Sequence, residues 1–131
     1  MKKSYLLSLI VLLVFCGCTN RASVAEWGSF TSEKAFSYDS KYYAVQKTTE
    51  TEDGTYINVE IYTSEDVLVD SFQPARARDF WGICWEKDTY NIWIQSGDIG
   101  ILCYSFDNEE WSRNNTAIRP EYIVSKYDDI T

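Results

Sequence analysis

From residue 29 onwards the chain alternates apolar and polar residues over short stretches, and turn-forming residues interrupt the alternation about every eight to twelve positions. A period of two indicates a β-strand with one buried face, whereas an amphipathic helix repeats about every 3.6 residues. Residue types that favour strands are frequent, including 10 Tyr and 5 Trp among 131 residues. Because long helical patterns are hard to find, we predict an all-β fold.

The expected strands fall into two groups, each of which should form an antiparallel meander. Within the first group, Asp53-Gly54 and Ser64-Glu65-Asp66 are typical of tight turns. The first group comprises residues 26–36, 42–48, 55–63 and 67–72, and the second comprises residues 80–86, 90–96, 99–106 and 111–118. We expect these two meanders, of about four strands each, to pack through their apolar faces as a sandwich-like domain.

The register of the second meander can be predicted by assuming two-residue loops at Lys87-Asp88 and Gly97-Asp98. One face of the sheet then becomes wholly apolar and is the expected core. It carries Trp81, Ile83, Trp85, Tyr90, Ile92, Ile94, Ile99, Ile101 and Cys103. The opposite face mixes aromatic and polar groups and carries Phe80, Gly82, Cys84, Asn91, Trp93, Gln95, Gly100, Leu102 and Tyr104.

This mixed face supplies a candidate ligand-binding platform. Trp93 would lie opposite Gly82, where its ring could lie flat over the strand. Its expected neighbours with hydrogen-bonding groups are Asn91, Gln95 and Tyr104. The alternative is that these groups bury against the termini or neighbouring strands, and for Trp93 this alternative is favoured.

The first meander also has one core face and one mixed face if its second loop has three residues. The expected core face carries Ile57, Val59, Ile61, Val67 and Val69, and the mixed face carries Tyr56, Asn58, Glu60, Tyr62, Leu68, Asp70 and Phe72. Near the carboxyl end, Pro120 could open a short helix or begin a strand, and a strand over residues 122–124 that closes a sheet edge is favoured. Residues 128–131 are expected to form a frayed tail.

The amino-terminal residues resemble a bacterial lipoprotein signal. Lys2 and Lys3 precede an apolar-biased run from Tyr5 to Phe15, which is too short to span a bilayer. Phe15-Cys16-Gly17-Cys18 closes this run and places a small residue before a cysteine, although the family prefers Leu where this chain has Phe15. The resemblance implies diacylglyceryl attachment at Cys18 and cleavage before it. The alternative is an ordinary cleaved secretory signal with a chance cysteine.

This resemblance divides the chain into four parts. Residues 1–17 would be the signal peptide, residues 18–28 a lipidated tether, residues 29–127 a single β domain and residues 128–131 a tail. Attached acyl chains would anchor the protein to the outer side of the cell membrane. Beyond this segment, the chain resembles the small lipoproteins of Gram-positive bacteria in its aromatic β character.

After such processing Cys84 and Cys103 would remain as the two thiols of the domain. They lie on the first and third expected strands of the second meander, about two strand spacings or roughly 9.5 Å apart. A disulfide needs Cα atoms within about 7 Å. We therefore expect two buried, unpaired thiols that pack as small apolar residues.

A weak internal repeat relates residues 36–45 to residues 84–93. The first copy, Phe36-Ser37-Tyr38-Asp39-Ser40-Lys41-Tyr42-Tyr43-Ala44-Val45, resembles the strand-turn-strand opening of Tol-type and WD-repeat propeller blades. The second copy keeps Tyr90 where the first has Tyr42. The resemblance covers about two blades, and propellers typically need four to eight, so a closed propeller is excluded for the monomer.

Composition disfavours several functional classes. After removal of residues 1–17, which carry Lys2 and Lys3, 10 basic side chains would face 20 acidic ones, and only Arg76 and Arg78 would lie close together as basic residues, so nucleic-acid binding is disfavoured. The chain contains no histidine, which removes Ser-His-Asp and Cys-His nucleophile activation and the commonest zinc ligand. The acidic run at residues 50–53 lacks the spacing of a calcium loop. No metal or other cofactor is expected.

Two functional hypotheses from different classes remain. The first is a membrane-anchored extracytoplasmic binding or accessory module, with a glycan, peptide or protein partner. The second is a small envelope enzyme that uses a pair of carboxylates as acid and base. The acids nearest to aromatic residues are Asp79, Glu86, Asp88 and Asp98, for which roles in turns and at strand ends are favoured. We expect the protein not to be an enzyme.

Overall fold

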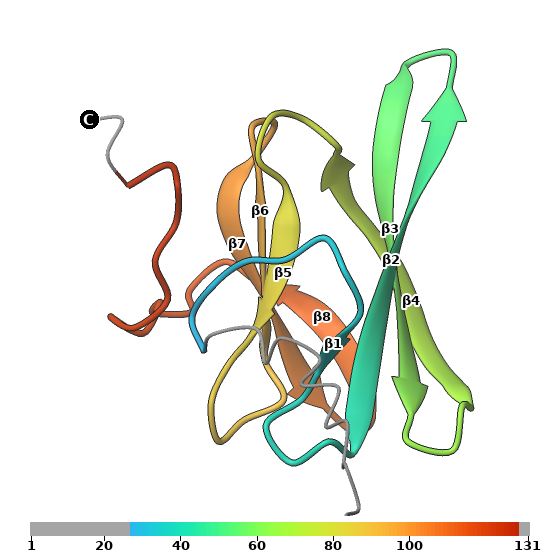
Figure 1. Cartoon of the computed structure of the whole chain (residues 1–131), viewed down its shortest axis with the longest axis vertical. Coiled ribbons are helices and arrows are strands. Elements are labelled where there is room, and N and C mark those ends of the chain that lie inside the picture. The colour runs from blue at the N-terminus through green and yellow to red at the C-terminus, as the bar shows by residue number, and fades with distance from the viewer. Residues whose placement is uncertain (1–26, 129–131) are drawn as a thin grey trace, which may run out of the picture.

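The computed structural model describes residues 27–128, which form two four-stranded antiparallel sheets packed face to face (Figure 1). The first sheet contains β1 (Ala35–Phe36), β2 (Tyr42–Thr51), β3 (Gly54–Thr63) and β4 (Leu68–Arg76). The second contains β5 (Gly82–Trp85), β6 (Ile92–Ser96), β7 (Gly100–Asp107) and β8 (Glu110–Asn114). Each sheet has its strands in chain order, so both are meanders. The all-β, sandwich-like prediction is confirmed.

The core lies between the two sheets, because each sheet turns its apolar face toward the other. Ile57, Val59 and Ile61 of β3 are fully buried, and Ile83, Ile92 and Ile94 are fully buried on the facing strands β5 and β6. Alternation with period two along each strand puts these residues on one face. Within the described part of the chain there is no helix, and therefore none that could cross a membrane.

The register of β5, β6 and β7 differs from the predicted one. The loop between β5 and β6 has four residues rather than two, since Glu86 N donates to Asn91 O and Trp85 pairs with Ile92. This shift of two positions leaves the faces unchanged. The loop between β6 and β7 has three residues, because Ser96 pairs with Gly100, and an odd shift exchanges the two faces of β7.

The exchange corrects the predicted core of the second meander. Leu102 and Tyr104 pack in the core beside Ile92 and Ile94, although both were expected on the mixed face. Cys103 and Ile101 instead lie with Trp93 on the outer face. Gly100 has a φ of +71°, which allows it to close the three-residue loop.

The first sheet departs from prediction through β-bulges in β4. The three-residue loop at 64–66 is as expected, since Thr63 N donates to Val67 O. The pairing of β3 with β4 then shifts twice, and each extra residue reverses the faces that follow. Consequently Phe72 turns inward and stacks on Tyr104 with ring centroids 4.0 Å apart. Val67, expected in the core, precedes both shifts and is exposed beside the loop at residues 64–66.

The crossover from β4 to β5 is fastened by Ser96, which is fully buried at the end of β6. Its hydroxyl donates to Arg76 O and accepts from the backbone N–H groups of Arg78 and Asp98, each at 3.3 Å. These contacts use the one donor and both acceptor positions of a serine hydroxyl. One side chain therefore fixes the connection between the sheets.

The chain ends of the described region form a third layer over the outer face of the second sheet (Figure 1). Ile123 is 2% exposed and packs against Cys84, Trp93 and Cys103. Ser125 Oγ donates to Gln95 Oε1 at 2.9 Å, which ties this layer to β6.

Two predictions for this region are wrong. Residues 122–124 form no strand, because they lie in an irregular path over the sheet face rather than at a sheet edge. Asp128, expected in a frayed tail, is held by Arg119 through two hydrogen bonds of 2.8 and 3.2 Å. Residues 129–131, the rest of the expected tail, lie outside the described residues.

Candidate functional site

The predicted platform does not exist as one surface. Trp93 is 4% exposed, pairs with Cys84 and Cys103 rather than Gly82, and donates from Nε1 to Glu86 Oε2 at 2.9 Å. Gln95 is 4% exposed beneath Ser125. The alternative of burial against the termini and neighbouring strands therefore holds for Trp93.

The other two platform residues have structural contacts of their own. Tyr104 points to the opposite face of the sheet, into the core, because of the three-residue loop. Asn91 is partly buried at the end of the β5–β6 loop, where it donates to Glu86 and accepts from Phe106 N. The four residues thus occupy two faces of the second sheet, and a shared ligand-binding surface is ruled out by this register.

The two cysteines of the domain are buried and unpaired, as predicted. Cys84 and Cys103 lie on either side of Trp93 across three adjacent strands, which keeps them two strand spacings apart. Burial raises the pKa of both thiols to about 11, so both are protonated at neutral pH. Cys18, the predicted lipidation site, lies outside the described residues.

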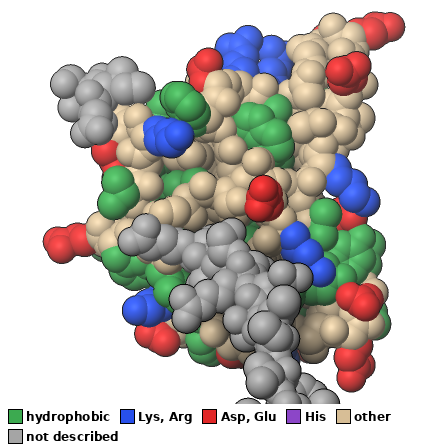
Figure 2. Space-filling view, in the orientation of Figure 1, with side chains coloured by type: hydrophobic (Ala, Val, Ile, Leu, Met, Phe, Trp, Pro, Cys, Tyr) green, Lys and Arg blue, Asp and Glu red, His purple; other side chains and the backbone are tan. Residues whose placement is uncertain are grey.

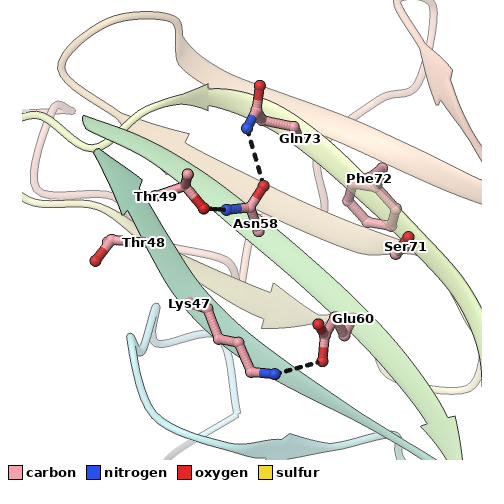
Figure 3. Close-up of a pocket in the computed structure, with 8 residues that line it drawn as sticks. All are labelled: Lys47, Thr48, Thr49, Asn58, Glu60, Ser71, Phe72 and Gln73. Atoms are coloured by element: carbon pink, nitrogen blue, oxygen red, sulfur yellow. Dashed lines mark hydrogen bonds and ion pairs between the residues drawn. The ribbon is translucent and has the colours of Figure 1, made fainter. Parts of the chain in front are cut away.

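The outer face of the first sheet is the more open of the two and contains a groove of about 490 Å³ (Figure 3). Three neighbouring strands supply its walls. Its lining residues are Lys47, Thr48 and Thr49 from β2, Asn58 and Glu60 from β3, and Ser71, Phe72 and Gln73 from β4. Most of these side chains are polar, and hydrogen bonds between them hold several in place.

Glu60 lies at the centre of one hydrogen-bonded group in this groove. Its Oε2 accepts from Tyr62 Oη at 2.5 Å and from Lys47 Nζ at 2.9 Å. The Tyr62 hydrogen bond, followed by the Lys47 hydrogen bond, holds the pKa of Glu60 below its ordinary value of 4.5. Glu60 therefore stays ionised and can accept further hydrogen bonds from a ligand.

A second group is built from amides. Asn58 Nδ2 donates to Thr49 Oγ1, and Gln73 Nε2 donates to Asn58 Oδ1 at 2.9 Å. The bulge in β4 brings Gln73 into reach of β3. Amide groups of this kind offer donors and acceptors side by side, as recognition of hydroxyl or peptide groups requires.

An aromatic row continues the same face toward β1. The rings of Tyr43 and Tyr62 stack with centroids 5.2 Å apart, and Phe36, 50% exposed, lies 5.6 Å from Tyr43. Lys34 Nζ sits 3.9 Å from the Tyr43 ring centroid. The hydrogen bond from Tyr43 to Asp66 raises the pKa of this phenol to about 12, so the hydroxyl remains a donor.

The four acids considered for catalysis take part in structural hydrogen bonds or lie in turns. Glu86 accepts from Trp93, and Asp98 accepts from Arg76 N at 3.2 Å. Asp79 and Asp88 have φ of +52° and +64° and occupy turns. Within residues 27–128, no three cysteine or acidic side chains form a cluster that could hold a metal ion.

Asp39 is a residue whose role the sequence did not reveal. It accepts from Tyr90 Oη at 2.5 Å and so joins the β1–β2 loop to the β5–β6 loop. Partial burial acts to raise the pKa of Asp39, but the hydrogen bonds from Tyr90, Lys41 and Ser37 outweigh it and lower the pKa. Asp39 and Tyr90 each lie in one copy of the weak repeat, but their contact depends on how the sheets pack.

The groove was also missed, although alternation had assigned Asn58 and Glu60 to an outward face. The wall formed by β4 could not be placed, because the bulges that turn Gln73 toward Asn58 leave no recognisable pattern. The face shown in Figure 2 carries acidic and basic side chains intermixed with separate apolar groups, without a large basic area.

Comparison with known proteins found no matching family model, no matching curated protein and no matching solved structure.

Proposed function

We propose that this chain is a membrane-anchored extracytoplasmic lipoprotein that acts as a binding or accessory module. Acyl chains on Cys18 would hold it at the cell membrane, and the open face of the first sheet would engage a glycan, peptide or protein partner. The amino-terminal sequence pattern supports the lipid anchor. The fold supports the binding surface.

The difference between the two outer faces is the observation that carries the binding proposal. Residues from both ends of the described chain cover Trp93 and its neighbours on the second sheet. The first sheet keeps its groove, with Glu60, Asn58 and Gln73 arranged by hydrogen bonds among groove side chains. Pre-arranged polar groups of this kind reduce the ordering cost of binding.

The alternative of carboxylate catalysis receives less support. A general acid needs a carboxyl group with a raised pKa, usually beside a second acid. Among the described residues, the carboxyl groups with shifted pKa are Asp39, Glu60 and Asp128, and each pKa is lowered. Their partners are hydroxyls, backbone N–H groups and cations, which suit permanently ionised acceptors.

The anchor is tested by feeding the producing bacterium a labelled fatty acid. The wild-type protein should carry label and fractionate with the membrane, and Cys18→Ala should lose the label and leave the membrane. Unlabelled wild-type protein in purified envelopes would contradict the anchor.

The binding face is tested by capture from detergent-solubilised envelopes of the same bacterium. Wild type should retain a component that the Asn58→Ala, Gln73→Ala double variant does not. Ser112→Ala, at an exposed position on β8, is the matched control and should behave like wild type. Equal retention by the groove variant and the control would contradict the proposed face.

A further inference from the structure

Exposed apolar side chains gather where the described chain begins. Trp27 is 39% exposed, Tyr122 is 38% exposed and Val124 is 65% exposed. We call Trp27, Tyr122 and Val124 the entry patch. Its members come from opposite ends of the described chain, yet they adjoin through main-chain contacts.

The backbone of this region is closely fitted. Val124 N donates to Gly28 O at 3.1 Å, which fixes residue 27 beside residue 124. Gly28 has a φ of +93°, and a side chain there would collide with Tyr122 O. Tyr122 Oη accepts from Lys87 N at 2.6 Å, so the patch is also tied to the β5–β6 loop. These contacts fix the backbone of the entry patch, and the fold therefore keeps its apolar side chains exposed.

We propose that the entry patch contacts the lipid bilayer and orients the domain on the membrane. This inference rests on the proposed anchor at Cys18. The nine peptide bonds that separate Cys18 from Trp27 span at most about 30 Å when extended, so an anchored chain keeps the entry patch close to the membrane surface. Tryptophan and tyrosine favour the membrane–water interface, where the ring is apolar and its polar atom stays hydrated.

The contact is apolar rather than electrostatic. The chain has a formal net charge of −8, which opposes attraction to anionic lipid. Near the entry patch, exposed Lys87 and Lys126 are offset by exposed Glu121 and Asp88. The orientation is therefore expected to be insensitive to salt, because screening weakens only the charge interactions.

This orientation leaves the groove free for a partner. The entry patch belongs to the layer that covers the second sheet, and the groove lies on the outer face of the first sheet. The two sheets lie on opposite sides of the core (Figure 1). A bilayer beneath the covering layer would thus present the groove away from the lipid.

The test uses the full lipid-modified protein in phosphatidylcholine vesicles whose acyl chains carry bromine, which quenches nearby tryptophan fluorescence. Trp85, Trp93 and Trp111 are at most 5% exposed and Trp81 is partly buried against the core, so Trp27, the most exposed tryptophan, should give most of the quenching. Trp27→Phe should lose that quenching, and Val124→Ser should reduce it, at low and at high salt. Phe36→Ser, at an exposed apolar site on the first sheet, is the control and should leave it unchanged.

Each other outcome overturns the inference in a distinguishable way. Protein that sediments with the vesicles but shows no Trp27 quenching would refute the orientation and leave the anchor intact. Wild type that fails to sediment with vesicles would refute the anchor and this inference together. If the fluorescence of Trp27 is not quenched and the protein mass per nanodisc corresponds to two chains, a second copy covers the entry patch in place of lipid, and the inference is overturned.

Discussion

At the scale of single residues, Ser96 has the clearest energetic role. Ser96 itself is fully buried, and replacing it by alanine leaves two partly buried backbone N–H groups and one partly buried carbonyl without their partner. Each unsatisfied buried group costs about 1 to 3 kcal/mol. We predict that Ser96→Ala lowers the free energy of unfolding, measured by urea titration, by about 1 to 3 kcal/mol or more, because three groups lose their partner.

Ser112→Ala provides the comparison, since Ser112 is exposed on β8. Its free energy of unfolding should stay within about 0.5 kcal/mol of wild type. Equal stability of the Ser96 and Ser112 variants would show that the crossover does not depend on the Ser96 hydroxyl.

Glu60 gives a prediction about pH. Its pKa in the folded protein lies below the ordinary 4.5, because Tyr62 and Lys47 donate to it. Such a group stabilises the fold above pH 4.5, and its contribution is lost as the pH falls through the lowered value. Between about pH 7 and about pH 3, Glu60→Gln should therefore lose less stability than wild type. A larger loss in the variant, measured by urea unfolding at both pH values, would contradict this assignment.

Residue identity alone could not decide the surroundings of Trp93. Its burial depends on Ile123, thirty positions later, which comes to rest on the outer face of the second sheet. Burial was the favoured alternative from the sequence, but its partners required the path of residues 115–128. In contrast, the separation of Cys84 and Cys103, and hence their unpaired state, could be predicted, because only strand spacing mattered for it.

At the scale of strands, the alternation of apolar and polar residues located the strands well. The lengths of the loops decided which residues of each strand face the core. The strands β2 to β7 were all expected close to their observed bounds. An error of two residues in the β5–β6 loop was harmless, whereas an error of one in the β6–β7 loop exchanged Leu102 and Cys103. The bulges in β4 had the same effect on Phe72. Loop lengths and bulges depend on backbone geometry, and the residue types present give little indication of either.

Gly82 tests how the second sheet is joined to the chain before β1. Thr31 and Ile83 exchange backbone hydrogen bonds of 2.9 and 2.8 Å beside Gly82. A Cβ at position 82 would lie 2.7 Å from Thr31 O, which is too close. We predict that Gly82→Ala destabilises the protein by about 1 to 3 kcal/mol, the usual cost of overpacking. Faster amide exchange at Thr31 and Ile83 should accompany the loss, and unchanged exchange at both would refute the explanation.

At the scale of the molecule, the packing of two meanders was predictable and the third layer was not. Two apolar sheet faces must cover each other, and this requirement could be read from the chain. The segments that cover the second sheet are irregular and have no period to recognise. They nevertheless decide which outer face is open within residues 27–128, because they cover the second sheet and leave the groove of the first sheet exposed.

Chemical labelling of Gln73→Cys tests this asymmetry most directly. Position 73 is exposed in the groove, and the buried thiols of Cys84 and Cys103 report on the covered face of the same molecule. In the native protein, treatment with a maleimide reagent followed by mass spectrometry should show rapid modification of the introduced thiol at position 73. Cys84 and Cys103 should react only after denaturant is added. Modification of Cys84 or Cys103 in the native protein as fast as the introduced thiol would contradict the account.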